Sequence, residues 1–508
     1  MKRYLIFILL LACAIGSAQN INDVLRYGTE NLQGTARFQG MGGAFGALGG
    51  DLSALNINPA GSAVFNNSLI TLSGTAYSRD NDASYFGAAT STSINDSELN
   101  QVGGVFVFRN TDEDSDWKKF SLAFNYDAVN NFNNRTTIRG NSNQSVANYF
   151  LDFAQGLPLE ALQVPEGELI ENAYRDLGFE DQQAFLGFQG FVFDLEDIDA
   201  PDSGNYLSNA KFSDNGSFNQ DYFIRESGYN NKFTLNAGSQ YTDRFYLGAS
   251  LNFHSVLYDR LTRLTENGFD ADSNVQFIEF DNFLRTQGAG FSFSVGGIAK
   301  LNEYVRLGGS YQSPTWYRLE DEFSQFINSN LAQDAIANGE SDIDFINLDL
   351  ITAFQPYTIK TPSKLNGSLA IIFGKNGLLS FDYGYQDFSK SELRPTNDGA
   401  FQPINAQISD DLGAVSTFRL GGEYRIQKFS LRGGYRFEQS PYTNGNTIDD
   451  LTGYSGGIGY NFGGSRLDLA INRTEQRINE SLFNPGSSTT ALVDRINTNA
   501  TLSYTINF

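Results

Sequence analysis

Residues 36–65 read ARFQGMGGAFGALGGDLSALNINPAGSAVF, a stretch rich in glycine, alanine and other small side chains. Side chains this small cannot build a core of their own, whereas glycine permits tight turns and close approach of one backbone to another. Asn58-Pro59 adds a turn signal, because proline fixes its own φ and asparagine can hydrogen-bond to its own backbone. We therefore expect residues 36–65 to form a compact plug inside a structure that the rest of the chain builds.

The first residues have the pattern of a secretory signal peptide. A positively charged start is followed by an apolar stretch over residues 4–15 and by small residues at 16–18. We predict that residues 1–18 are removed and that the remaining chain crosses the inner membrane. The alternative is a lipoprotein signal, in which Cys13 would become a lipidated first residue.

Composition narrows the class of protein. The chain has 508 residues, a formal net charge of -23 and 14% aromatic residues, so the basic surface typical of nucleic-acid binding is absent. Cys13 is the single cysteine, and its predicted removal leaves neither disulfides nor thiolate metal sites. After the leader, no apolar stretch reaches the roughly 18 residues of a membrane helix. A transmembrane β-barrel remains possible, because its strands need only one apolar face.

Alternation with a period of two begins after Phe65. In residues 496–508 one face is almost entirely apolar and the other is polar. This pattern is typical of a strand with one face toward an apolar environment and the other toward water. Residues 245–254, 418–426 and 429–438 repeat it. A water-soluble β-sandwich would show the same alternation, so the connections between strands must decide.

The connections favour an outer-membrane barrel. Short turns alternate with long loops along the chain, which is typical of periplasmic turns and extracellular loops. We predict an all-β fold, a 14-stranded antiparallel transmembrane β-barrel over residues 67–508, with a plug over residues 19–66 in its lumen. The even count places both termini on the periplasmic side, and Phe508 gives the chain an aromatic end suited to barrel assembly. The predicted strands lie near residues 67–92, 102–109, 119–130, 230–241, 244–258, 285–300, 303–314, 357–373, 377–388, 413–426, 428–439, 452–462, 465–476 and 495–508.

The longest predicted loop, residues 131–229, has structure of its own. Helical spacing over residues 145–163 and 166–188 predicts a partly helical extracellular loop with many aromatic side chains. Two interpretations stay open. The aromatic side chains form a hydrophobic core within the loop itself, or they line a surface groove that first binds a hydrophobic ligand. Another helix is expected near residues 331–338.

The small-residue stretch carries a resemblance to a known family. In order, it contains Gly40-Met41-Gly42-Gly43-Ala44, Asp51-Leu52-Ser53-Ala54 and Asn58-Pro59-Ala60-Gly61. With these motifs ahead of the strands, the chain resembles the FadL/TodX family of outer-membrane transporters for long-chain fatty acids and other hydrophobic compounds. The resemblance implies ligand binding in the lumen, a hatch that shifts, and a kinked third strand that opens a lateral exit. The predicted third strand, residues 120–129, has neither proline nor internal glycine, which argues against such an exit.

We assign a hatch or gating role to polar, charged and small residues of this stretch. Arg37 and Asp51 flank it, and inside a lumen an unpaired charge would be costly. We therefore expect both to pair with barrel charges, of which Arg419, Arg425, Arg432 and Arg436 are candidates. Ligand-binding residues are not assigned. The hatch or gating residues are Arg37, Gly40, Gly42, Gly43, Asp51, Ser53, Asn58, Pro59 and Ala60.

Other motifs are weaker. His254 falls on the wet side of its strand, where a hydrogen-bonded lumen histidine is expected and a heme ligand is the alternative. The acidic run at 194–202 has no EF-hand spacing, so we expect a solvated loop rather than a calcium site. Gly40 to Gly43 lack the strand and helix context of a dinucleotide site, and no serine elbow motif occurs. We therefore predict no enzyme, no cofactor and no metal.

The predicted function is passive, hatch-gated uptake of hydrophobic small molecules, with long-chain fatty acids as the expected ligand. The protein is expected to be a monomer among outer-membrane lipids. The alternatives are a FadL-like barrel that serves a secretion or surface-attachment partner, and a hemin receptor, since relatives with these roles occur in the family. A nonspecific polar porin is disfavoured by the plug.

Overall fold

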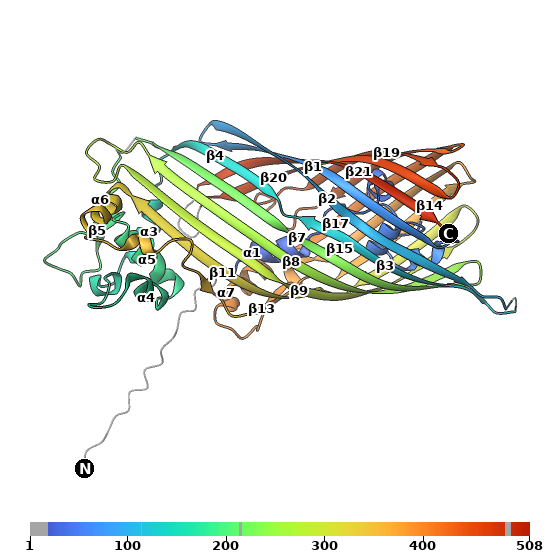
Figure 1. The fold of residues 1–508 in the computed structure, drawn as a ribbon, viewed down its shortest axis with the longest axis horizontal. Helices are drawn as coiled ribbons and strands as arrows, with labels where there is room; N and C mark the ends of the chain where they lie inside the picture. Colours follow the sequence, from blue (N-terminus) through green and yellow to red (C-terminus); the bar gives the residue numbers. More distant parts are fainter. Residues whose placement is uncertain (1–18, 113, 213–215, 483–488) are drawn as a thin grey trace, which may run out of the picture.

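A computed structural model of the chain describes residues 19–112, 114–212, 216–482 and 489–508. The predicted signal peptide, residues 1–18, lies outside the described residues. The described strands form a closed antiparallel barrel of 14 wall strands, which confirms the predicted fold class. The barrel is elongated, and it closes where the first wall strand pairs with the last, Leu69 opposite Asn507 (Figure 1). Within the described part of the chain, no helix combines the length and apolarity needed to cross a bilayer.

The wall strands follow one another around the barrel in chain order, and some are interrupted. In order, they are β1 (Leu69–Tyr85), β2 (Ala88–Arg109), β3 (Trp117–Asn131) with β4 (Asn134–Ser142), β7 (Phe218–Tyr241), β8 (Phe245–Asn267), β9 (Phe277–Lys300), β10 (Val305–Gln312) with β11 (Trp316–Ser329), β13 (Tyr357–Lys360) with β14 (Lys364–Phe373), β15 (Gly377–Asp387) with β16 (Glu392–Arg394), β17 (Ala414–Ile426), β18 (Phe429–Glu438), β19 (Leu451–Asn461), β20 (Ser465–Ser481) and β21 (Thr490–Asn507). Three short strands lie on the extracellular side, namely β5 (Phe193–Leu195), β6 (Tyr206–Ser208) and β12 (Thr352–Ala353).

Several predicted strand ends are wrong. The segment predicted as one strand, 67–92, contains a hairpin, because β1 ends at Tyr85 and β2 starts at Ala88. The loop predicted at 259–284 is mostly strand, since β8 and β9 pair as far as Asn267 and Phe277. In the second segment the outward side chains include charged ones such as Asp259, so the alternation of apolar and polar residues fades although the backbone ladder continues.

The outer face of the barrel has an apolar band and a polar extension. On β8 the outward side chains from Phe245 to Phe253 are exposed and largely apolar, as lipid contact requires. Farther along the same strand, Asp259 pairs with Arg285 of β9, with Nε and Oδ1 2.8 Å apart. The barrel therefore continues beyond its apolar band toward the extracellular side, where its surface is charged.

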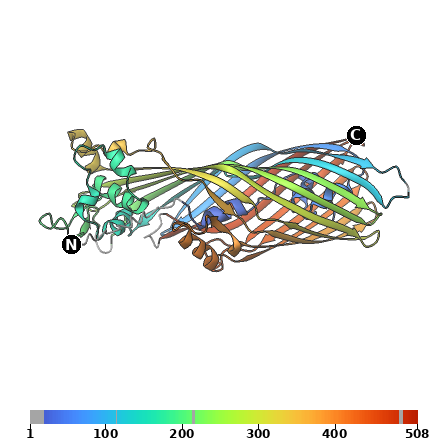
Figure 2. The ribbon, with the colours of Figure 1, turned by 90° about the horizontal axis from the view of Figure 1, so that it is seen from below.

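The N-terminal segment lies inside the barrel (Figures 1 and 2). We call residues 36–65 the plug core and residues 19–35 the upper plug. The plug core contacts opposite sides of the wall: its last helical turn lies against β7, β8 and β9, and its first against β19 and β20. The helices are α1 (Ile21–Gly28) in the upper plug, and α2 (Ala36–Gly40), η1 (Leu52–Asn56) and η2 (Pro59–Val64) in the plug core.

Helices from the long loops form a cap at the extracellular end of the barrel (Figure 2). The cap has a large apolar core in which Phe150, Phe185 and Phe193 are fully buried, together with rim residues such as Phe280 of β9. The prediction of a partly helical loop is confirmed, and its aromatics form a core shared with the barrel rim. The helices are α3 (Val146–Ala154), η3 (Leu159–Leu162), α4 (Ile170–Arg175), α5 (Phe179–Gln189), α6 (Asn330–Asn338) and η4 (Ile343–Phe345), while η5 (Phe388–Lys390) and α7 (Phe401–Asp411) lie beside α1.

Candidate functional site

Polar residues start the helical turns of the plug core, and the first of them is the last residue of the upper plug. The hydroxyl of Thr35 accepts a hydrogen bond from the backbone N–H of Phe38 (3.1 Å) at the start of α2. Asp51 Oδ1 accepts from the backbone N–H of Ser53 (3.1 Å) at the start of η1. Asn58 starts η2 with Pro59 in its first turn. These residues are thus N-caps, which satisfy backbone donors that a helix end leaves free.

Asn58 and Pro59 also join the plug to the wall. The Asn58 side-chain amide donates to the carbonyl of Gly46 (2.8 Å) within the plug and to that of Gly297 (3.0 Å) on β9. The carbonyl of Pro59 accepts from Asn236 Nδ2 of β7 (2.9 Å). The turn predicted at this dipeptide is therefore also an attachment to two wall strands.

Glycines of the wall let the plug backbone touch the strand backbone. A Cβ atom on Gly248 would lie 2.3 Å from the Pro59 carbonyl oxygen, and one on Gly434 would lie 2.2 Å from the Gly42 nitrogen. Both distances are too short for any real side chain, so only glycine fits. These wall residues could not be predicted from sequence, because a strand glycine carries no side chain whose polarity marks a face. Similar contacts occur at Gly238, Gly296, Gly308 and Gly421.

A buried ion network connects the plug core to the wall. Arg37 Nε lies 2.9 Å from Glu423 Oε2, and the same oxygen lies 2.7 Å from Nε of Arg432. Arg432 Nη1 lies 2.8 Å from Asp468 Oδ1, and the Glu423, Arg432 and Asp468 side chains are each 1% exposed. The expected pairing of Arg37 with a barrel charge is thus found, with Glu423 as its partner. Glu423 was not among the predicted partners, although it is a charged residue on the polar face of residues 418–426.

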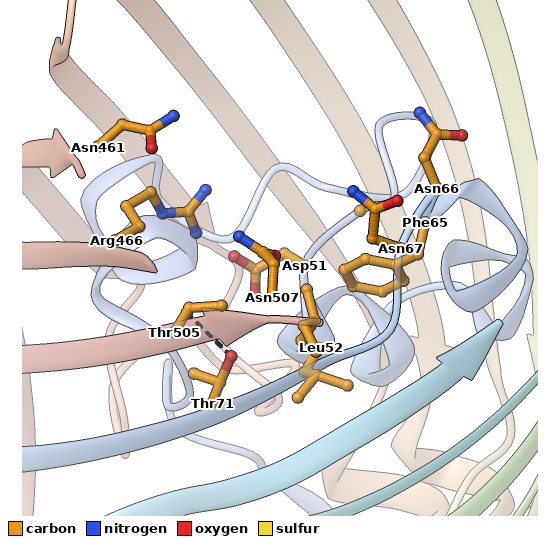
Figure 3. A pocket seen from close by; sticks show the side chains of 12 residues that line it. Asp51, Leu52, Phe65, Asn66, Asn67, Thr71, Asn461, Arg466, Thr505 and Asn507 are labelled. Atoms are coloured by element: carbon orange, nitrogen blue, oxygen red, sulfur yellow. Dashed lines mark hydrogen bonds between the residues drawn. The ribbon is translucent and has the colours of Figure 1, made fainter. Parts of the chain in front are cut away.

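The expected pairing of Asp51 with a wall arginine is wrong. Asp51 Oδ1 accepts from the Thr35 hydroxyl (2.8 Å), and Oδ2 is buried with no hydrogen-bond partner among the described residues. The candidate Arg432 is already engaged by Glu423, and Arg436 pairs with Glu438. Asp51 instead lines a cavity of about 200 Å³ between the plug and the barrel end (Figure 3).

The remaining predicted residues shape the plug itself. Gly42 and Gly43 both have positive φ, +60° and +77°, which makes a sharp turn that other residues rarely adopt. Ser53 Oγ accepts from the backbone N–H of Thr35 (2.7 Å) and from Gln101 Nε2 (2.9 Å). Ala60 is buried in an apolar cluster of η2 and the wall. A Cβ on Gly40 would make an ordinary contact with Gly457, 3.4 Å from its Cα.

The upper plug is held by charges that sequence analysis did not single out. The Glu30 carboxylate lies 2.7 Å from Lys364 Nζ of β14 and 3.7 Å from Lys232 Nζ of β7. Its backbone carbonyl accepts from Arg436 Nη2 (3.3 Å). Two features of the sequence could have indicated these contacts: Lys232 and Lys364 are basic residues in two of the predicted strands.

The upper plug also packs against wall and loop residues through an apolar cluster. Val24 and Tyr27 of α1 are buried in one apolar cluster with Tyr317, Phe388 and Ile408, so that α1 packs beneath η5 and α7. This cluster has no counterpart in the sequence-based assignment, because its members come from distant segments.

His254 lies beside this cluster and is buried. Its Nδ1 is 3.1 Å from Asn230 Oδ1 and 3.0 Å from the Tyr317 hydroxyl. This is the hydrogen-bonded lumen histidine expected from the alternation. Among the residues that the structure describes, including the acidic run at 194–202, no group of histidine, cysteine, aspartate and glutamate is arranged to hold a metal ion.

A seam interrupts the wall beside the upper plug. The β2–β3 ladder ends at Gln101 opposite Asp127, and β3 shifts register against β7 between Ala128 and Asn130. Asn130 Nδ2 donates to the carbonyl of Thr29 (2.9 Å), so the upper plug covers the inner side of this seam. The lack of proline and glycine in the third strand therefore did not prevent an interruption, because a bulge suffices.

The sequence of the barrel matches a known protein family. Residues 229–506 match the family described as outer membrane protein transport protein (OMPP1/FadL/TodX), which is more than half of the chain. The match lies in the barrel and does not include residues 36–65, on which the resemblance rested. No curated protein matches the sequence.

Solved structures align with this chain at low sequence identity. A Pseudomonas aeruginosa FadL homologue aligns over 95% of this chain and 100% of its own, with 14% identity and a TM-score of 0.52. The Pseudomonas putida toluene transporter TodX aligns over 94% and 99%, with 14% identity and a TM-score of 0.48. Members of the matched family are outer-membrane channels for hydrophobic compounds and not enzymes. The chain therefore belongs to the OMPP1/FadL/TodX family of outer membrane transport proteins.

Proposed function

We propose that this protein takes up hydrophobic small molecules passively, with long-chain fatty acids as its ligands and the plug as its gate. The observation that carries the proposal is the plug core, which fills the lumen and is attached to the wall by polar contacts and one ion network. A barrel closed in this way conducts only when the plug moves. The neutral contacts suit such movement, because a hydrogen bond lost to the wall is replaced by one to water at a net cost of about 1 kcal/mol.

The residues assigned to gating hold the closed state in this proposal. Arg37 provides the charged attachment, and Asn58 and Pro59 provide the neutral ones. Asp51 acts inside the plug by fixing η1 and Thr35. A molecule that passes the plug would leave through the periplasmic end or through the seam beside Asn130.

A reversible disulfide between plug and wall tests the gate. Ser62 Oγ of η2 lies 3.2 Å from Ser121 Oγ of β3, so Ser62→Cys with Ser121→Cys places two thiols within reach. Uptake of radiolabelled oleate and toluene is measured in cells that lack other barrels of this kind. We expect oxidation to reduce uptake to background and a reductant to restore it.

Ser62→Cys alone is the control, because it cannot form the bond. Full uptake by the oxidised double variant contradicts gating by the plug core. If the wild-type protein also supports no uptake and a stoichiometric partner co-purifies with it, the role in a secretion or surface-attachment system is the better function.

A further inference from the structure

Two arginines lie side by side on the outer face of the barrel, beyond its apolar band. Arg135 of β4 is the direct cross-strand partner of Arg225 of β7, and both residues are exposed. We call these two residues the arginine pair. Side chains directly opposite each other in an antiparallel ladder start about 4.5–5.5 Å apart, so like charges at such positions repel each other.

The neighbouring carboxylates of the outer face are already in ion pairs. Asp221 of β7 lies 2.6 Å from Nε of Arg139, and Asp259 of β8 lies 2.8 Å from Nε of Arg285. Glu226 faces the lumen, because successive residues of a strand point to opposite faces. Among the described residues, the arginine pair is therefore left without an ionic partner, in a chain whose formal net charge is -23.

The guanidinium groups of the pair keep their hydrogen-bond donors free. The guanidinium carbon of Arg135 lies 5.8 Å from the ring centroid of Phe223, which is on the same outer face as Arg225. A cation–π contact restrains the side chain without neutralising its charge. Neither guanidinium donates a hydrogen bond to another residue in the parts of the chain that the structure describes. An anion on this face would therefore find unoccupied donors.

The arginine pair lies at the height of the lipid head groups. Tyr229 is the exposed aromatic residue of β7 nearest the extracellular end, and it marks the edge of the apolar band. Arg225 is four residues closer to the cap, toward which β4 and β7 both continue (Figure 1). At about 3.3 Å per residue and a strand tilt of about 40°, this places Arg225 about 10 Å beyond Tyr229. The head-group region is about 5–8 Å thick, and a long arginine side chain can bend toward it.

We propose that Arg135 and Arg225 bind the phosphate group of a lipid in the outer leaflet of the outer membrane. Guanidinium groups bind phosphate oxygens through pairs of parallel N–H donors, and two of them side by side can share one phosphate. A bound phosphate removes the repulsion within the pair and links β4 to β7. The inference does not depend on the proposed uptake function, because the site lies on the outside of the barrel.

The position of the pair gives the bound lipid a structural role. The ladder of β4 is formed with β7, whereas the β2–β3 ladder ends at Gln101 opposite Asp127, before β4 begins. The wall is therefore interrupted on the side of β4 that faces β2. A lipid held by the arginine pair stabilises the β4–β7 ladder beside this interruption.

Binding of two lipids that differ only in phosphate tests the site. The full-length protein in a neutral detergent is titrated with monophosphoryl lipid A and with its dephosphorylated form, and native mass spectrometry measures the fraction of protein with bound lipid. We expect the wild type to bind the phosphorylated lipid more tightly. Arg135→Gln with Arg225→Gln should lower this affinity about tenfold or more, because two basic contacts to an anionic lipid are lost. Binding of the dephosphorylated lipid should stay unchanged.

Arg473→Gln with Arg477→Gln is the matched control. These arginines are also about half exposed on a wall strand, but they pair with Glu475 and Asp494. The control should keep the wild-type affinity, and heat-modifiable migration in gels confirms that each variant is folded. If the double variant of the arginine pair does not fold, Arg225→Gln alone replaces it, with a smaller loss of affinity expected.

Three results overturn the proposal. The first is equal affinity of the wild type for the phosphorylated and the dephosphorylated lipid. The second is an equal loss of affinity in the arginine-pair variant and in the control. The third is displacement of the lipid by an equimolar amount of inorganic phosphate, which would show that the pair binds free anions rather than a lipid.

Discussion

The plug core and the cap are both segments that pack on the barrel, yet they are held in different ways. The cap has an extended apolar core in which side chains such as Phe150 and Phe185 are fully buried. The plug core touches the wall through backbone, glycine and hydroxyl groups, and its apolar clusters are small.

Under the proposed gating, this difference separates a permanent part, the cap, from a movable one, the plug core. Exposing apolar surface costs about 25 cal/mol for each Å², so the cap cannot detach without unfolding. Neutral hydrogen bonds are exchanged for water at small net cost. What resists removal of the plug core is the ion network at Arg37 and the close fit at the wall glycines.

The largest effect is expected from breaking the ion network. Glu423→Gln leaves Arg37 and Arg432 with one buried carboxylate fewer, and loss of one partner of a buried pair costs about 3–5 kcal/mol. The free energy of unfolding is measured by urea titration of the reconstituted barrel. Glu475→Gln is the control, because its pair with Arg473 is about half exposed and contributes about 1 kcal/mol at most. If Glu423→Gln and Glu475→Gln lower the free energy of unfolding equally, the buried ion network stabilises the protein no more than an exposed ion pair does.

A smaller effect is expected from a single methyl group at the wall. Gly434→Ala drives a Cβ into the backbone of Gly42, and overpacking of this kind costs about 1–3 kcal/mol. Gly433→Ala on the same strand meets nothing within 4 Å. Urea titration and protease sensitivity of residues 36–65 should change only in the first variant. If both variants have the same stability and protease sensitivity, close packing between the plug and the wall glycines does not hold the plug in place.

A third effect concerns the cap and its dependence on pH. Glu266, on the extension of β8 beyond the apolar band, accepts hydrogen bonds from the Val146 backbone N–H (2.8 Å) and Gln220 Nε2 (2.6 Å). Burial raises the pKa of Glu266 to about 7, against about 4.5 for the unfolded chain. The folded state therefore retains a proton that the unfolded state loses, so stability falls as pH rises from about 4.5 to 7, by at most about 1.4 kcal/mol per pH unit.

Glu266→Gln is expected to flatten this dependence. Cap unfolding is followed by proteolysis of residues 143–217 between pH 5 and pH 8, and Glu475→Gln should keep the wild-type slope. The same slope in Glu266→Gln as in the wild type would assign the pH dependence to another group.

The sequence alone determined the architecture, because alternation of polar and apolar residues and the lengths of connections depend on local order. The small residues of 36–65 indicated a plug for the same reason, and Asn58 and Asp51 were visible as polar groups within it. Strand ends were less accessible: where the outer face becomes charged, as at Asp259, the pattern fades while the ladder continues.

The contacts of the plug were decided by the tertiary structure. Glu423, Lys364 and Gly434 come from strands far from the plug in sequence, and their closeness to Arg37, Glu30 and Gly42 depends on the curvature and register of the closed barrel. Asp51 shows the same limit, since its charge predicted a wall arginine while the geometry gave it Thr35 and Ser53. Periodicity specifies which face a residue occupies, but only closure of the barrel specifies which residue stands opposite.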